Sequence, residues 1–364
     1  MNTVKIIIGT LILFALIGMS AAIPVEKWNK KIEMGDNSYF NSFQLAKNGG
    51  YIFAGQINFN SAIVKTNKNG SISWNKTYDI LNNSVFSSVQ LTTDGGFILA
   101  GSTRPIDTFS DNGLLVKTDK DGNELWTKYF GGEEYDSFNI VRQTSDDGYI
   151  IVGESSSFSD NLQDIWLVKI DKDGNEMWNR TLSSNYDSSS DIKITSDGGY
   201  VITGSSGITN GLIFKVDGYG NKQWTKIFET QGLVSSIQQT SDGGYIVTGY
   251  TPFISVHQNR GVGWIANLTK KGKITWKKSI KHGSYNEIQS VRITNDGGYI
   301  IAGSMANDGL DGLLVKFNKK GKELWIHGDD AVYEFQDVIE TSKNKYTIFG
   351  YTDPYPRIIK IVDK

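Results

Sequence analysis

The sequence contains no cysteine, and its 364 residues include only 5 prolines and 3 histidines. Without cysteine there is no disulfide, thiolate metal site, thiol nucleophile or lipid-bearing cysteine. The net charge is −2, with both signs interspersed along the chain. Because no basic stripe is present, we expect no binding to nucleic acid. Sustained apolar periodicity with helix caps is also missing, which argues against a helical fold.

The N-terminal residues differ from all that follow. Lys5 precedes an apolar run at 6–18, and the small residues Ser20, Ala21 and Ala22 come next. A basic start, a short apolar core and an A-x-A-like site are typical of a secretory signal peptide. We therefore expect a signal peptide at 1–22, a mature chain at 23–364, and a location outside the cell or in its envelope. An uncleaved anchor is the alternative. No later stretch is apolar enough to span a membrane.

A polar turn followed by a β-branched run recurs seven times in the chain. The phrase is KNGGYIFAG at 47–55, TDGGFILAG at 93–101, SDDGYIIVG at 145–153, SDGGYVITG at 196–204, SDGGYIVTG at 241–249, NDGGYIIAG at 295–303 and, in shorter form, KNKYTIFG at 343–350. A tryptophan follows six of these phrases: Trp74, Trp126, Trp178, Trp224, Trp276 and Trp325. Periods of this length indicate a repeat architecture.

Each unit contains four short strand-like segments, which in the third unit are 138–143, 149–153, 165–171 and 176–182. Segments rich in Ile, Val, Tyr and Trp and bounded by Gly, Asp and Asn are typical of strands. Four antiparallel strands per repeat form a propeller blade. The sequence therefore predicts an all-β protein, a single seven-bladed β-propeller of four-stranded antiparallel blades at 23–364.

The turn residues and the tryptophans each have a structural interpretation. The DGG and KDGN turns suit hairpins that need positive φ. A calcium loop is the alternative for 119–123, but the equivalent turn at 269–273 keeps only its glycine. We expect the recurrent tryptophans to pack between blades rather than to stack on a ligand. Most third strands also carry a lysine. We expect these lysines either to pair with a turn aspartate or to snorkel past the strand end to solvent. These are Lys65, Lys117, Lys169, Lys215, Lys316 and Lys360.

The seventh unit ends before its fourth strand. The mature N-terminus around Trp28 reads VEKWNKK, which matches the tryptophan strands LWTK and MWNR of other units. The interval from Trp28 to Trp74 is 46 residues, within the range of the repeat. We therefore predict that the N-terminal strand completes the last blade, closing the ring and covering an edge that would otherwise aggregate.

The phrases TDKDGNELW at 118–126 and IDKDGNEMW at 170–178 resemble the tryptophan-docking repeat of PQQ-like, quinoprotein-type β-propellers. They are still more similar to the secreted propeller-repeat proteins of archaea and bacteria. The resemblance covers 28–364 and concerns turn and packing residues. WD40 and Kelch patterns fit poorly. Quinone dehydrogenases of the related type typically have eight blades, a vicinal cysteine pair and calcium, so we expect no such cofactor and no metal here.

Function is expected on the face where loops vary in length, since variable loops on a rigid scaffold are the usual place for binding. We predict a possible ligand face formed by Arg104, Glu133, Glu134, Tyr135, His257, Arg260, His282, His327 and Tyr333. Its partner would be a protein, or else a glycan, and the protein a monomer without enzymatic activity. Five Asn-x-Ser/Thr sequons offer glycosylation sites upon export.

Three alternatives stay open at this point. One is a hydrolase or lyase with carboxylates at the channel mouth, for which Glu133 and Glu134 are candidates. Another is a metal site that joins the histidines to Asp329 and Asp330, although no close ligand spacing supports it. The last is a purely structural component of the cell surface.

Overall fold

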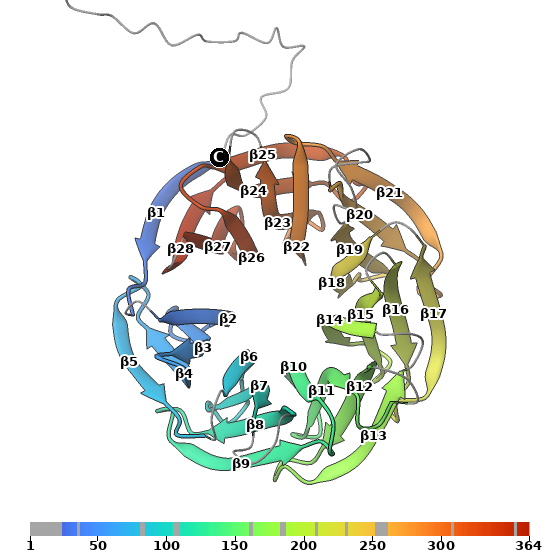
Figure 1. Cartoon of the computed structure of the whole chain (residues 1–364). Coiled ribbons are helices and arrows are strands. Elements are labelled where there is room, and N and C mark those ends of the chain that lie inside the picture. Colours follow the sequence, from blue (N-terminus) through green and yellow to red (C-terminus); the bar gives the residue numbers. More distant parts are fainter. Residues whose placement is uncertain are drawn as a thin grey trace, which may run out of the picture.

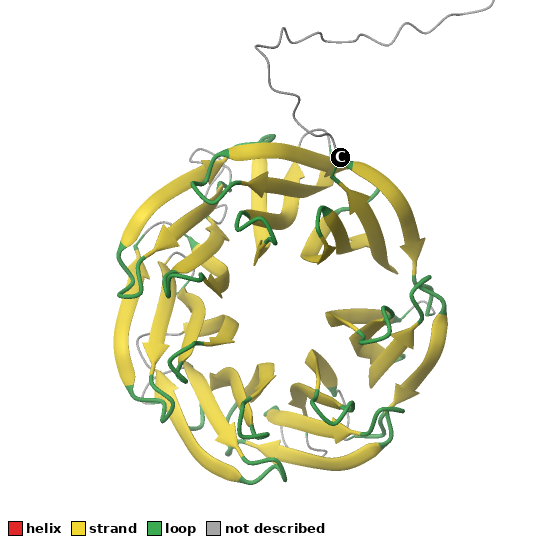
Figure 2. Cartoon of the chain, turned by 180° about the vertical axis from the view of Figure 1, so that it is seen from behind, coloured by secondary structure: helices red, strands yellow, loops and turns green. Residues whose placement is uncertain are grey.

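The fold is a closed ring of seven four-stranded sheets (Figure 1). This computed structural model describes residues 24–34, 37–80, 84–104, 110–159, 163–182, 187–207, 210–229, 232–251, 261–306, 309–352 and 355–363. Within them only strands and their connections occur (Figure 2), and no helix is long and apolar enough to cross a bilayer. The expected signal peptide at 1–22 lies outside the described residues.

Six blades are formed by consecutive strands. Blade 1 contains β2 (Ser38–Leu45), β3 (Tyr51–Ile57), β4 (Asn60–Thr66) and β5 (Ile72–Thr77), and blade 2 contains β6 (Val85–Leu91), β7 (Phe97–Thr103), β8 (Asn112–Thr118) and β9 (Glu124–Phe130). Blade 3 contains β10 (Asp136–Gln143), β11 (Tyr149–Ser155), β12 (Asp164–Ile170) and β13 (Glu176–Leu182), and blade 4 contains β14 (Asp187–Ile194), β15 (Tyr200–Ser206), β16 (Asn210–Val216) and β17 (Lys222–Phe228). Blade 5 contains β18 (Leu233–Gln239), β19 (Tyr245–Tyr250), β20 (Gly263–Leu268) and β21 (Ile274–Ile280), and blade 6 contains β22 (Tyr285–Ile293), β23 (Tyr299–Ala306), β24 (Leu310–Phe317) and β25 (Glu323–Asp329).

Blade 7 joins the two ends of the chain. It contains β26 (Glu334–Ser342), β27 (Lys345–Thr352), β28 (Tyr355–Val362) and, as its outer strand, β1 (Val25–Lys31). Trp28 lies opposite Lys360 in the antiparallel pairing of β1 with β28. The predicted seven-bladed ring and its closure by the N-terminal strand are therefore confirmed.

The hydrophobic core is divided among the seven junctions between neighbouring blades. Each cluster of buried side chains combines two blades, as where Ile63 of blade 1 packs with Leu99 and Val116 of blade 2. The cluster at the closing junction joins Phe349 and Ile358 of blade 7 to blade 1. Because every blade contributes to two clusters, no blade can bury its apolar surface without both neighbours.

The recurrent tryptophans lie at these junctions, as the sequence predicts. The ring of Trp74 lies beneath the turn of the next blade, where a Cβ added to Gly122 would be 2.8 Å from the indole. Trp74 and Phe97 meet edge to face, with ring centres 6.1 Å apart. Trp126, Trp178, Trp224 and Trp276 likewise contact a turn glycine and a tyrosine ring of the blade that follows each of them. Each tryptophan therefore docks its blade onto the next one.

Four of the six third-strand lysines are buried and paired with turn aspartates. Four ion pairs repeat around the ring: Lys117–Asp94 at 2.7 Å, Lys169–Asp146 at 2.9 Å, Lys215–Asp197 at 3.0 Å and Lys316–Asp296 at 2.9 Å. The lysine side chains are 1–5% exposed. Lys65 and Lys360 instead lie near the rings of Trp74 and Trp28. Pairing with aspartate, rather than snorkelling, thus accounts for four of the six lysines.

Candidate functional site

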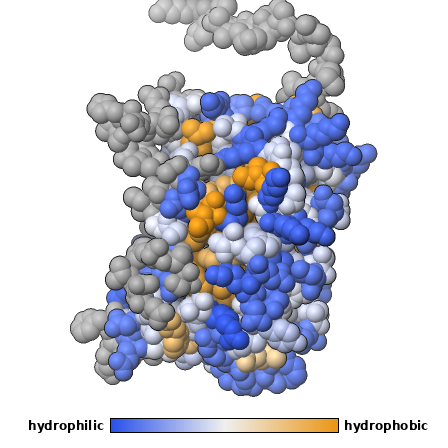
Figure 3. All heavy atoms as spheres, turned by 90° about the vertical axis from the view of Figure 1, so that its right-hand side faces the viewer, coloured by the Kyte–Doolittle hydropathy of each residue, from blue (hydrophilic) through white to orange (hydrophobic). Residues whose placement is uncertain are grey.

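The ring has two distinct faces and an axial channel. The turn face carries the short hairpins between first and second strands and between third and fourth strands. The loop face carries the connections between second and third strands and from each blade to the next. Between these faces the seven inner strands, β2, β6, β10, β14, β18, β22 and β26, line the channel (Figure 1). On the side of the ring shown in Figure 3, patches of apolar side chains lie among hydrophilic ones.

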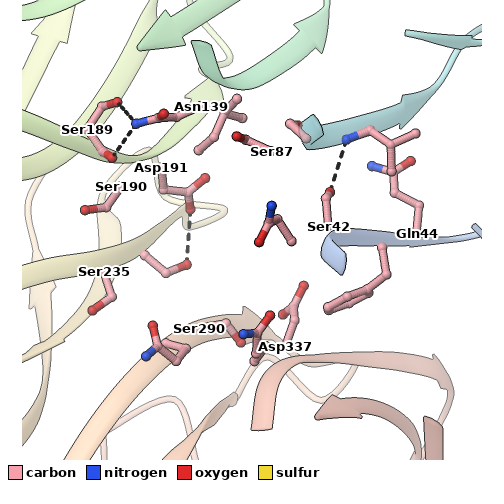
Figure 4. A pocket seen from close by; sticks show the side chains of 18 of the residues that line it. Ser42, Gln44, Ser87, Asn139, Ser189, Ser190, Asp191, Ser235, Ser290 and Asp337 are labelled. Carbon is pink, nitrogen blue, oxygen red and sulfur yellow. Dashed lines mark hydrogen bonds between the residues drawn. The ribbon is translucent and has the colours of Figure 1, made fainter. Parts of the chain in front are cut away.

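A bulge in every inner strand creates a polar lining for the channel. The pairing register shifts at one equivalent position in each strand, as between Phe40 and Ser42 in β2. The extra residue at a bulge is left unpaired in the hydrogen-bond ladder, and its side chain points in a new direction. The seven bulged residues are all polar and all line one cavity of about 380 Å³: Asn41, Ser87, Asn139, Ser190, Ser235, Gln289 and Gln336 (Figure 4).

The next residue along several inner strands connects neighbouring blades. The Ser42 hydroxyl accepts a hydrogen bond from the Val89 backbone N–H at 3.1 Å. The Asp191 carboxylate likewise accepts a hydrogen bond from the Ile237 backbone N–H at 3.2 Å. These side chains satisfy backbone donors at the bulges, where the ladder is interrupted. The wall of the channel is consequently held by polar contacts between blades as well as within them.

A cluster of charged side chains lies across the channel toward the turn face. The Arg292 guanidinium donates from Nε to Asp337 at 2.9 Å and makes a second bond from Nη2 to the other carboxylate oxygen. Opposite this pair, the Lys193 ammonium is 2.5 Å from Asp191. Arg142 is 4.0 Å from the same carboxylate. Blades 3, 4, 6 and 7 thus bring together three cations and two carboxylates.

Burial and mutual interaction shift the pKa values in this charged cluster. Burial lowers the pKa of Lys193 to about 8, although Asp191 acts in the opposite direction. Burial alone would raise the pKa of Asp191, but Lys193 and Arg142 hold it below its ordinary value. Burial would lower the pKa of Arg292, yet the Asp337 carboxylate raises it. Since Arg142 and Arg292 each lower the pKa of Lys193, the cluster acts as one electrostatic unit.

The end of the channel near the loop face is acidic instead. Tyr285 donates to Glu287 at 2.6 Å, and Gln289 donates to Glu334 at 2.6 Å. Burial, with the Glu287 charge as a further cause, raises the pKa of Glu334. Burial also raises the pKa of Glu154, despite hydrogen bonds from Ser189 and Asn139. The channel is therefore polarised along its axis, with carboxylates at one end and cations toward the other.

Several residues of the predicted ligand face lie on the loop face. Tyr135 and Tyr333 are 40% and 50% exposed in the connections before β10 and β26. Glu133 and Glu134 are exposed beside Tyr135. Arg104 pairs with Asp111 at 2.7 Å in the connection between β7 and β8. Arg104 and Tyr135 lie together at the junction of blades 2 and 3, whereas Tyr333 lies at the crossing into blade 7, so these residues do not form one compact site.

The histidines are not gathered into a group. His282 lies after β21 and is 3.0 Å from Glu323 of the next blade. His327 lies within β25, in the outer strand, and its Nε2 has no hydrogen-bond partner among the described residues. His257 and Arg260 fall outside the described residues. In the part of the chain that the structure describes, no group of three His, Asp or Glu side chains is arranged to hold a metal ion.

Sequence reasoning missed two features. The first is a set of exposed aromatic side chains, Tyr39, Phe59 and Phe158, which adds to the predicted Tyr135 and Tyr333. The second is the axial charged cluster. In the sequence, Arg142, Lys193 and Arg292 share one position, two residues before the turn threonines Thr144, Thr195 and Thr294. Other blades have uncharged residues at this position, so only the assembled ring shows that the three cations meet in the channel.

Comparison with known proteins identifies the fold alone. No family model matches the chain, and no curated protein matches it. Among solved structures, Sqt1 from Chaetomium thermophilum is similar over 93% of this chain and 100% of its own, with 9% identity and a TM-score of 0.53. A protein of unknown function from Bacteroides caccae is similar over 70% of this chain and 82% of its own, with 14% identity and a TM-score of 0.45. The similarity to Sqt1 therefore shows that the chain shares a β-propeller fold.

Proposed function

We propose that this protein is an exported, non-enzymatic scaffold that binds a protein partner on its loop face. The observation that carries the proposal is the distribution of exposed aromatic side chains. Phe59 is 67% exposed and Phe158 is 45% exposed, and both lie in connections between second and third strands. Aromatic residues are enriched at the centres of protein interfaces, where they bury much area at small entropic cost.

The spacing of these side chains supports a protein partner over a glycan. Phe59 belongs to blade 1, Phe158 to blade 3, and Tyr333 to the crossing from blade 6 to blade 7. A stable protein interface buries roughly 800 Å² on each partner, which spans several blades. A glycan that stacks on aromatic rings would need them close together in one groove, and the rings on blades 1, 3 and 7 are not arranged in this way.

One observation favours a second candidate function, a hydrolase or lyase at the channel mouth. Glu334 and Glu154 have raised pKa values and lie near the acidic end of the channel, and carboxylates of this kind serve as general acids. Both are already engaged by neighbouring amides or serines. Loss of turnover of a substrate on changing Glu334 to Gln would establish this candidate instead.

Export and family membership belong to the same proposal. The apolar N-terminus supports export, and β1 begins at Val25, so cleavage after Ala22 would leave the ring whole. The contact of each recurrent tryptophan with the turn of the following blade supports a place among the secreted tryptophan-docking propellers. Cell fractionation and N-terminal sequencing of the purified protein would test the expected mature start at Ile23.

The proposed binding face can be tested with chemical cross-linking of the mature chain in a cell-envelope extract. A variant with Phe59, Phe158 and Tyr333 changed to Ser should lose its cross-linked protein partners without a change in thermal unfolding. The control is Tyr219→Ser, because Tyr219 is 74% exposed but lies on the turn face. Equal recovery of partners by the triple variant and the control would refute the loop-face assignment, and recovery of glycan alone would refute the protein partner.

A further inference from the structure

The charged cluster of the channel carries more positive than negative charge. It consists of Arg142, Lys193 and Arg292 with Asp191 and Asp337, so one positive charge is left without a carboxylate. The three cationic side chains are 18–35% exposed, and a partly buried charge without a counter-charge attracts an ion or ligand of the opposite sign. The composition of the cluster therefore favours a bound monoanion.

Arg142 is the cation with donors to offer. Its Nη1 donates to the Val141 carbonyl at 2.8 Å, and its Nη2 is 4.0 Å from Asp191, which is too long for a hydrogen bond. The Arg292 guanidinium, by contrast, is held by Asp337 through two bonds. Arg142, beside the Asp191–Lys193 pair of the adjacent blade, thus offers the donors on which an anion would be best stabilised.

The wall around the charged cluster contains polar atoms that lack partners. The Ser290 side chain is buried, with the residue only 6% exposed, and its hydroxyl has no hydrogen-bond partner among the described residues. The Ser235 hydroxyl and the Gln238 side-chain amide are likewise buried and unpaired. Ser235 and Ser290 both line the channel cavity (Figure 4). Buried hydroxyl and amide groups are almost always hydrogen-bonded, so Ser235 and Ser290 favour a polar, hydrogen-bonding occupant of the channel.

The acidic end of the channel does not cancel this preference. Glu287 and Arg292 lie on the same strand, five residues apart, which corresponds to roughly 15 Å along a β-strand. An anion that enters from the turn face reaches Arg142 and Lys193 without passing Glu287 or Glu334. A second cavity, lined by Gln44, Arg292, Asn295 and Glu340, lies toward the turn face and shares lining residues with the central one. The Glu340 carboxylate there accepts hydrogen bonds from the Asn295 and Asn344 backbone N–H groups.

We propose that the axial channel binds a small hydroxylated monocarboxylate of the sugar-acid class. Its carboxylate would bind the Arg142 guanidinium beside the Asp191–Lys193 pair, and its hydroxyl groups would bond to Ser235 and Ser290. The cavity of about 380 Å³ accommodates a molecule of this size, because small-molecule sites occupy about 300–1,000 Å³. The binding site in the channel is independent of the aromatic side chains proposed to bind a protein on the loop face.

Isothermal titration calorimetry of the mature chain with D-glucuronate, D-gluconate, D-glucose and inorganic phosphate tests this proposal. Glucuronate or gluconate should bind with a stoichiometry of one, while glucose and phosphate should bind at least about tenfold more weakly. Two variants should shift the affinity for the sugar acid in opposite directions. Lys193→Gln removes a cation and should weaken binding about tenfold, whereas Asp191→Asn removes a carboxylate, retains acceptors for Ser236 and Ile237, and should tighten it.

The opposite shifts separate a ligand site from a structural role. A purely structural cluster would lose stability in both variants and gain affinity in neither. Circular dichroism checks that each variant folds, and if Lys193→Gln does not fold, the tightening by Asp191→Asn decides alone. The proposal is overturned if neither sugar acid binds at millimolar concentration, if phosphate binds as tightly as the sugar acids, or if Asp191→Asn leaves the affinity unchanged.

Discussion

The Lys360 ammonium lies 4.8 Å from the centre of the Trp28 ring, although these residues come from opposite ends of the chain. Trp28 also contacts Gly70 of blade 1, so a single side chain connects the N-terminal strand, the C-terminal strand and the neighbouring blade. In the other blades, the equivalent tryptophan lies on a strand that follows the other three strands of its blade directly in the sequence. The ends of the chain therefore meet through the interaction that repeats around the ring.

The docking of tryptophan on glycine predicts unequal effects for two glycines. Gly95 and Gly122 both have positive φ, so Gly95→Ala and Gly122→Ala each incur backbone strain of about 1 kcal/mol. A Cβ at Gly95 meets nothing within 4 Å, but one at Gly122 would lie 2.8 Å from Trp74. We expect Gly122→Ala to cost about 1–3 kcal/mol more, measured by urea unfolding. Equal losses of unfolding free energy in the two variants would show that the indole does not restrict the size of residue 122.

The buried lysines predict a second difference, between two aspartates of equivalent turns. Asp197→Asn should destabilise the protein by about 2–3 kcal/mol, because Lys215 would be left buried without its counter-charge. Asp242 has no such lysine, since Asn267 occupies that position in blade 5. Asp242→Asn should cost less than about 1 kcal/mol, and blade 1 already has Asn48 in this turn. Thermal unfolding of both variants tests this prediction, and similar midpoints would contradict it.

Acidic pH should lower the stability of the propeller by protonating aspartates in the same turns. Burial alone would raise the pKa values of Asp94 and Asp296, but hydrogen bonds from their turn threonines and from Lys117 and Lys316 lower both to about 2. Because the folded pKa lies below the unfolded value of about 3.9, each aspartate stabilises the protein above about pH 4. That contribution, on the order of 1 kcal/mol each for partly exposed groups, is lost as the pH falls toward 2.

Urea unfolding between about pH 6 and about pH 2 measures this effect. A double variant, Asp94→Asn with Asp296→Asn, should be less stable at neutral pH and should lose less stability on acidification than the parent chain. Parallel curves for the variant and the parent would show that other carboxylates govern acid unfolding.

The repeats allowed most of the scaffold to be predicted, because turns and docking tryptophans must recur at fixed positions in every blade. The order of strands, the blade number and the place of Trp28 in blade 7 all follow from that recurrence. The channel could not be predicted in this way, since its specific residues differ between blades. Arg142 occupies the position that holds Gln44 in blade 1 and Ile339 in blade 7, and only the assembled ring places it near Lys193 and Arg292.

The exposed aromatic residues of the loop face could likewise be predicted only in part from the sequence. Tyr135 and Tyr333 were identified from loop length and composition, and both are exposed on the loop face. Phe59 lies in a two-residue connection between β3 and β4, too short to attract notice in the sequence, yet it is the most exposed phenylalanine among the described residues. Its positive φ of 67° shows that a tight turn, rather than a long loop, presents this ring to solvent.

Closure of the ring by the N-terminal strand is tested most directly by a disulfide across blade 7. The chain has no cysteine of its own, and Lys31 lies opposite Arg357 in the pairing of β1 with β28. Under mild oxidation, the variant Lys31→Cys with Arg357→Cys should form an intramolecular disulfide in nearly all folded molecules, measured by mass spectrometry and non-reducing electrophoresis. A control pair, Lys31→Cys with Lys226→Cys, joins β1 to β17 across the ring (Figure 1) and should form none. Absence of the disulfide in the first pair, or equal yields in both pairs, would contradict the closed seven-bladed ring.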